Sequence, residues 1–120
     1  MGSIQIALSD TAKADALRVL LARSTQVPVV CVECPNYEDA CAVVLDGPHF
    51  NAASGPLSHP ERIVLITNTD PTHLRAAWEA GVNSVLTEHD PMNTVVLAVL
   101  ASCLRSGSTR QKQTANRERL

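Results

Sequence analysis

The stretch that decides the fold runs from residue 62 to residue 104: RIVLITNTDP (62–71), THLRAAWEAG (72–81), VNSVLTEHDP (82–91) and MNTVVLAVLASCL (92–104). It holds two apolar runs, and the dipeptide Asp-Pro follows each of them. Aspartate caps helix amino termini and proline suits the first helical position, so each dipeptide predicts the start of a helix. Gly81 is suited to end the first of these helices. The stretch therefore predicts strand, helix, strand, helix, over residues 63–67, 71–80, 83–87 and 91–105.

The amino-terminal part repeats this alternation. Ile4–Leu8 reads as a strand, and Asp10 or Thr11 begins a helix that extends to about Arg23. The β-branched run Val27–Glu33 predicts a second strand, buried on both faces.

The middle of the chain allows two interpretations. Tyr37–Cys41 is long enough for about one helical turn, and Ala42–Leu45 then reads as a third strand stopped by Asp-Gly-Pro. The rival interpretation is a single helix over Asn36–Leu45; the pair Val43-Val44 favours the strand. Residues 47–61, with three prolines and two glycines, predict a loop.

The order of elements predicts one α/β domain. Five strands alternate with helices, and their connections are too long for hairpins, so we expect a five-stranded parallel sheet with helices on both faces. In such sheets functional residues gather at the carboxyl ends of the strands. We assign residues 1–105 to the domain and residues 106–120 to a basic linker or tail.

Composition narrows the range of functions. The chain has 120 residues, 45% of them apolar, and only three aromatic side chains, which argues against a nucleic-acid surface built on stacked bases. The net charge of −2 divides into −6 over residues 1–104 (five basic, eleven acidic) and +4 over residues 105–120 (five basic, one acidic). No run approaches the ~20 apolar residues of a membrane span, and the chain opens directly into a strand. These features lead us to expect a cytoplasmic protein without membrane contact.

Four cysteines include one Cys-x-x-Cys pair, Cys31 and Cys34. Zinc would need further ligands, for which Cys41 and either His49 or His59 are the candidates. Residues three apart on a strand point to opposite faces, which argues against a metal. The alternative is that Cys31 is a small core residue and that the other thiols pack or face solvent.

Residues 4–104 resemble the receiver domain of response regulators, the CheY-like domain, and most of all the receivers of LuxR-type helix-turn-helix regulators. The resemblance implies a flavodoxin-like (βα)5 fold, here with shortened second and third helices. Receivers accept a phosphoryl group from a kinase histidine on an aspartate after the third strand, beside Mg²⁺ held by two acidic residues. A hydroxyl residue after the fourth strand and a lysine after the fifth bind the phosphoryl oxygens.

The resemblance places Asp46 at the phosphoacceptor position, Asp10 at one of the two acidic positions and Thr67 at the hydroxyl position. Glu88 stands where receivers carry the lysine, and the second acidic residue beside Asp10 is missing. Val85 lies in the region where many receivers have a switching aromatic residue. Simpler roles are open for the first three: Asp10 as a helix cap, Asp46 as the start of an Asp-Gly turn, and Thr67 as a strand-end hydroxyl bonded to backbone.

Three carboxylates at one edge of the sheet would oppose a phosphoryl group, so we interpret the chain as a degenerate, or pseudo-, receiver. We expect no enzyme activity and no resident cofactor, with signalling through homodimerisation or through binding of a partner or ligand, to control transcription. The last helix is apolar over more of its circumference than a core needs, and Leu97, Leu100 and Leu104 are its candidate dimer face.

Two alternatives stay open. One is a phosphoaccepting receiver that uses Asp46 with Mg²⁺ and has a histidine kinase as its partner. The other is a small-molecule sensor that binds its ligand near residues 47–61, in a pocket beside Asp46 and Phe50. The carboxylates of Asp10, Asp46 and Glu88, with His89 as a further ligand, would also suit a divalent cation without phosphate. We expect DNA contact only through an output domain that follows the linker.

Overall fold

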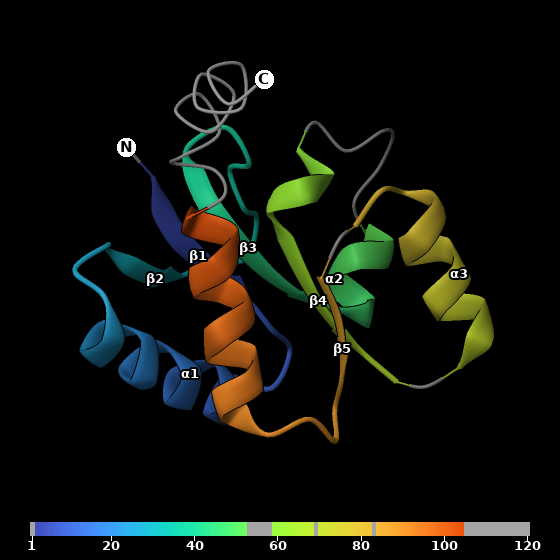
Figure 1. Cartoon of the computed structure of the whole chain (residues 1–120). Coiled ribbons are helices and arrows are strands. Elements are labelled where there is room, and N and C mark those ends of the chain that lie inside the picture. The colour runs from blue at the N-terminus through green and yellow to red at the C-terminus, as the bar shows by residue number, and fades with distance from the viewer. Residues whose placement is uncertain (1, 53–58, 69, 83, 105–120) are drawn as a thin grey trace, which may run out of the picture.

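The computed structural model describes residues 2–52, 59–68, 70–82 and 84–104. Five strands form one sheet in which every pair is parallel, in the order β2-β1-β3-β4-β5 (Figure 1). They are β1 (Ser3–Ala7), β2 (Val29–Cys31), β3 (Ala40–Asp46), β4 (Ile63–Thr67) and β5 (Ser84–Thr87). This is the flavodoxin-like order, as the sequence predicts, and its topological switch point lies between β1 and β3.

Helices cover both faces of the sheet (Figure 1). They are α1 (Thr11–Ser24), α2 (Gly47–Ala52), the 3₁₀ turn η1 (Pro60–Arg62), α3 (Pro71–Glu79) and a last helix over residues 92–104. The core on one face joins α1 and the last helix to the strands; it contains Ile4, Ile6, Leu17, Leu21, Val44, Val64, Ile66, Val95 and Val99. The core on the other face lies under α2 and α3; it contains Val43, Leu45, Ile63, Leu65 and Ala77. The alternation along β3 and β4 sends successive side chains to opposite cores.

The helix caps follow the sequence at two of three predicted positions. Asp10 accepts a hydrogen bond from the backbone N–H of Lys13 at the start of α1. Asp70 accepts from the N–H of Thr72 at the start of α3, and Gly81 adopts the positive φ of 89° that favours glycine after a helix. The prediction for Asp90 is wrong: its carboxylate accepts from the backbone N–H of Thr87 and so closes the turn after β5.

The second strand is shorter and more exposed than predicted. β2 has three residues at the edge of the sheet, with Val30 and Cys31 exposed, whereas the sequence predicted a buried strand over 27–33. No helix forms over residues 32–39; Asn36 instead donates its backbone N–H to the buried side-chain oxygen of Gln5. Because the side chain of Gln5 is buried, its oxygen needs a hydrogen-bond donor. The irregular segment supplies the backbone N–H of Asn36, whereas the apolar face of a helix would offer no donor.

The third strand is confirmed and the rival helix over 36–45 is wrong, because β3 covers residues 40–46 at the centre of the sheet. The prediction of a loop over 47–61 is wrong in two places, at α2 and η1. Asp46 directly precedes α2 and accepts from the N–H of His49, three residues later, so it caps the amino terminus of this helix. The helix has six residues, too few to show periodicity in the sequence. Residues 53–58 lie outside the described part of the chain.

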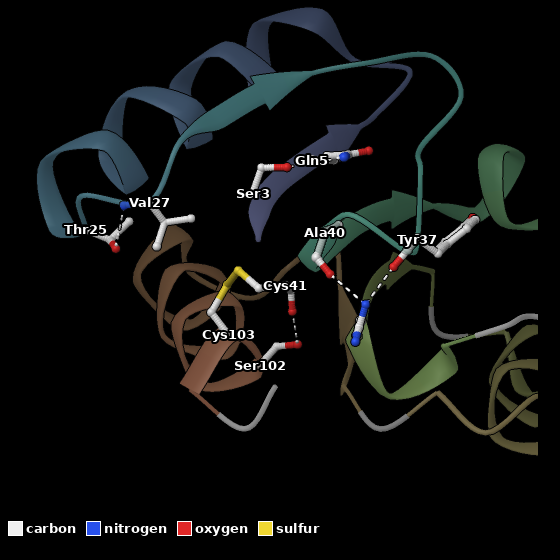
Figure 2. Close-up of a disulfide and its surroundings, with 10 residues drawn as sticks. Ser3, Gln5, Thr25, Val27, Tyr37, Ala40, Cys41, Ser102 and Cys103 are labelled. Atoms are coloured by element: carbon white, nitrogen blue, oxygen red, sulfur yellow. Dashed lines mark hydrogen bonds between the residues drawn. A yellow bond between two sulfur atoms is a disulfide. The ribbon is translucent and has the colours of Figure 1, made fainter. Parts of the chain in front are cut away.

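A disulfide between Cys41 and Cys103 joins the start of β3 to the end of the last helix (Figure 2). The hydroxyl of Ser102 donates to the carbonyl of Cys41 beside it, at 3.4 Å. The sequence interpretation, in which these thiols pack or face solvent, is wrong for this pair. The two cysteines are 62 positions apart in the sequence, so the sequence alone does not reveal the pairing, and the parallel topology brings them together.

Arg62 holds the irregular segment over residues 32–39 in place by hydrogen bonds, where a second helix was expected. Its Nη1 donates to the carbonyls of Tyr37 (2.9 Å), Ala40 (3.2 Å) and Glu38 (3.3 Å), two of which Figure 2 shows. The guanidinium therefore connects the end of η1 to the turn before β3. Sequence reasoning gave this arginine no role.

Over the described ranges, no helix is long and apolar enough to cross a membrane.

Candidate functional site

The predicted site residues meet at the carboxyl edge of the sheet. Asp46 is the last residue of β3, Asp10 precedes α1, and Glu88 follows β5. All three line one cavity of about 320 Å³, whose apolar wall is formed by Leu8 and Ile66. The convergence that the resemblance implied is therefore present.

Asp46 is held by hydrogen bonds on both carboxylate oxygens. Oδ2 accepts from the backbone N–H of Ser9 at 2.6 Å, which connects β3 to the end of β1. Oδ1 accepts from the backbone N–H of His49 at 3.1 Å and lies 2.7 Å from the Nδ1 of the same residue. The carboxylate thus acts as a cap and as a tie between two strands, and each of its oxygens has a donor from the protein.

These contacts also set the ionisation of Asp46. Partial burial raises its pKa, but the hydrogen bonds from Ser9 and His49 outweigh burial and hold the pKa below the ordinary value. Asp46 is therefore a carboxylate at neutral pH, stabilised by donors of the protein itself.

A cation faces the same cavity from a position that sequence reasoning missed. Lys13, on the first turn of α1, lines the cavity together with Asp10, Asp46 and Glu88. It sits three residues after the helix cap, and this spacing is the signal that would have found it, because that position faces the same end of the sheet. The cavity lining carries three carboxylates and one ammonium group, a surplus of negative charge.

The hydroxyl position is placed as predicted but does not join the cavity lining. Thr67 is the last residue of β4 and is buried, and its carbonyl accepts from the N–H of Glu88. Its hydroxyl oxygen would lie 3.8 Å from a Cβ built on Gly47, so it faces the start of α2. His89 is exposed on the turn after β5, where its N–H donates to Thr87.

The residues present do not fit the magnesium site of a receiver. Asp10 has no acidic neighbour, and no group of three or more His, Cys, Asp or Glu is placed to hold a metal in the described ranges. The candidates for the further zinc ligands do not come together, because they have other partners in the structure. Cys41 is in a disulfide, and His59 lies near Glu38 and Glu61 before β4.

The predicted dimer face is exposed in part. Leu97 and Leu104 lie two turns apart on the last helix, with 67% and 71% of their surfaces exposed. Leu100 is partly buried and packs against the core beside α1. Leu97 and Leu104 therefore remain candidates for an interface, and Leu100 belongs mainly to the core.

No protein-family model matches the chain, and no curated protein matches it. Solved structures do match. The receiver domain of a Francisella response regulator matches with a TM-score of 0.61 and 11% identity, over 88% of this chain and 99% of that one. Full-length FixJ from B. japonicum matches with a TM-score of 0.65 and 15% identity, over 98% of this chain and 64% of that one.

A protein from Burkholderia pseudomallei, described as pilus assembly-related, matches with a TM-score of 0.60 and 18% identity, over 88% of this chain and 91% of that one. Identities this low establish shared architecture and leave the chemistry to be argued from the site. The chain has the flavodoxin-like fold of response-regulator receiver domains.

Proposed function

We propose that this chain is a pseudo-receiver, a receiver domain that signals without the aspartyl phosphorylation cycle. The observation that carries the proposal is the state of Asp46, whose two oxygens are both occupied by donors of the protein itself. Glu88 strengthens it, because a carboxylate at the lysine position repels the charge that a phosphoryl group brings. Phosphoryl transfer needs cations around the developing charge, and among the described residues Lys13 is the one cation on the lining of this cavity.

The test is a titration with Mg²⁺ followed by beryllofluoride, a phosphoryl mimic, read by amide chemical shifts. We expect no saturable change at Ser9, Asp46 or Thr67 in the wild type. An active receiver domain serves as the positive control. Tight binding that disappears in Asp46→Asn would contradict the proposal and establish the alternative, a phosphoaccepting receiver with a kinase partner.

The second alternative, a ligand pocket beside Asp46 and Phe50, has less support. Phe50 lies on α2 and packs against the core formed by Val43, Leu45 and their neighbours. Its ring is therefore used for packing at the place where the hypothesis needed a ligand contact.

We further propose that the domain acts by homodimerisation through Leu97 and Leu104, to control transcription through an output domain. The exposure of both leucines on one side of the last helix supports an apolar contact. The resemblance to LuxR-type receivers suggests the output, and the match to FixJ, a longer chain, is compatible with a further domain. The tail over 105–120 lies outside the described residues.

Light scattering after size exclusion tests the interface. We expect Leu97→Glu with Leu104→Glu to convert a dimer into a monomer, because each glutamate places a charge in the apolar contact. Trp78→Glu on α3, where the indole is 75% exposed, is the matched control and should leave the dimer intact. A monomeric wild type, or a dimer that only Trp78→Glu disrupts, would refute this face.

A further inference from the structure

The end of β2 and the segment after it place two thiols on the lining of one cavity. β2 ends at Cys31, and the chain bends at residues 33 and 34. The alternation that would send Cys31 and Cys34 to opposite faces therefore stops at Cys31. Both cysteines are exposed free thiols, and both line the same cavity.

This cavity differs from the one around Asp46. It has a volume of about 780 Å³ and lies between α1 and the segment that follows β2. Apolar side chains contribute a large part of its lining: Ile6, Leu8, Ala14 and Val32. A volume in this range suits a small ligand or an ion with its thiol ligands.

The other possible ligands on the cavity lining are the imidazole of His49 and the carboxylates of Asp15 and Glu33, whose oxygens are hard ligands. His49 lines the cavity, but its Nδ1 lies 2.7 Å from Asp46. The carboxylate of Asp15 pairs with Arg18 at 2.7 Å. No group of three or more metal-binding side chains occurs in the parts of the chain that the structure describes. Zinc and iron–sulfur clusters need about four such ligands, so two thiols alone do not satisfy them.

We propose that Cys31 and Cys34 form a two-thiolate site for Cu(I). Thiolates are the soft ligands that Cu(I) selects, and Cu(I) is stable with only two of them in a near-linear arrangement. One Cu⁺ forms two Cu–S bonds while the two thiols release two protons to solvent. The metal keeps its oxidation state throughout, so the step requires no oxidant or reductant.

The test is an anaerobic competition against the chromophoric chelator bicinchoninate, with ascorbate as a non-thiol reductant. We expect one Cu(I) per chain, and two sulfur neighbours in the X-ray absorption spectrum. Cys31→Ser and Cys34→Ser should each weaken Cu(I) binding by more than about 100-fold. Loss of a residue that only hydrogen-bonds to a metal ligand typically weakens binding by about 10- to 100-fold, so the larger effect identifies a direct ligand. Zn²⁺ should show no stoichiometric site.

The double variant Cys41→Ser with Cys103→Ser is the matched control, since it removes the other sulfur pair and should keep the Cu(I) affinity. If that variant does not fold, alkylation of the two exposed thiols in the intact chain replaces it and should abolish binding. Undiminished binding in either single variant overturns the proposal, and so does a lack of binding by the reduced wild type. The result is independent of the beryllofluoride titration, because the two cavities share no carboxylate.

Discussion

Asp46 shows how a side chain at a catalytic position can become structural. Its carboxylate receives N–H groups from two segments, Ser9 after β1 and His49 in α2. Each hydrogen bond to a charged acceptor contributes about 1.5–3 kcal/mol, so the charge stabilises the fold directly.

The lowered pKa of Asp46 predicts a specific pH dependence. The folded state binds the proton more weakly than the unfolded state, so this contribution is fully present above the unfolded pKa, about 3.9. It is lost as pH falls through the folded value. Asp46→Asn should be less stable than the wild type by about 1–2 kcal/mol at pH 7. The difference should shrink at pH 3, as measured by urea unfolding at both pH values.

A difference between wild type and Asp46→Asn that is equal at pH 7 and pH 3 would show that the charge contributes nothing. Asp46→Ala removes both acceptor oxygens and is the reference for a complete loss of the cap. At neutral pH it should lower the free energy of unfolding more than Asp46→Asn does.

At the scale of elements, Arg62 compensates for the missing second helix. The segment before β3 forms no helix, and the carbonyls of its residues Tyr37 and Glu38, with that of Ala40 at the start of β3, accept from one guanidinium nitrogen. A charged donor in a fixed planar group suits this task better than a flexible ammonium.

We predict that Arg62→Met destabilises the fold by about 2–3 kcal/mol, because it leaves partly buried carbonyls without their donor. The free energy of unfolding of Arg62→Lys should lie between those of Arg62→Met and the wild type. Arg75→Met, at an exposed position on α3, is the control and should stay within about 0.5 kcal/mol. Chemical denaturation measures all three, and an Arg62→Met variant as stable as the control would contradict the role of the guanidinium.

Sequence signals differ in strength between the two halves of the chain. β4, α3, β5 and the last helix were predictable because apolar runs and Asp-Pro or Gly punctuation agree on each boundary. β2 was misjudged because a β-branched run looks the same at a sheet edge as at its centre. α2 was not predicted because its six residues are too few to show a helical period in the sequence.

The candidate site was predictable as a place and only partly as chemistry. Asp10, Asp46 and Glu88 follow from strand order, since parallel strands bring their carboxyl ends to one edge. The occupation of Asp46 by Ser9 and His49 depends on backbone geometry and was not predicted. An aspartate directly before a helix suggests a cap, so Asp46 would have been recognised had the helix itself been expected.

For the whole molecule, the Cys41–Cys103 disulfide is a covalent constraint between residues 62 positions apart in the sequence. It fixes the end of the last helix to the start of β3. Disulfides of this kind persist in oxidising surroundings and are rare in the cytosol. The expectation of a cytoplasmic location thus stays a prediction, and the disulfide argues against it.

Breaking this disulfide should destabilise the domain chiefly through the unfolded state. The 62-residue separation corresponds to about 4 kcal/mol of chain entropy, and measured effects are commonly smaller, so we predict a loss of about 2–4 kcal/mol. Urea unfolding with and without dithiothreitol measures it, and the reduced chain should also show a steeper denaturant dependence, because its unfolded state exposes more surface. Dithiothreitol should leave the double variant Cys41→Ser with Cys103→Ser unchanged, and should act on Cys31→Ser with Cys34→Ser as it acts on the wild type. If the wild type unfolds identically under both conditions, the two thiols are not joined in solution, and noncovalent contacts such as the packing of Val95, Val96 and Val99 hold the last helix to the sheet.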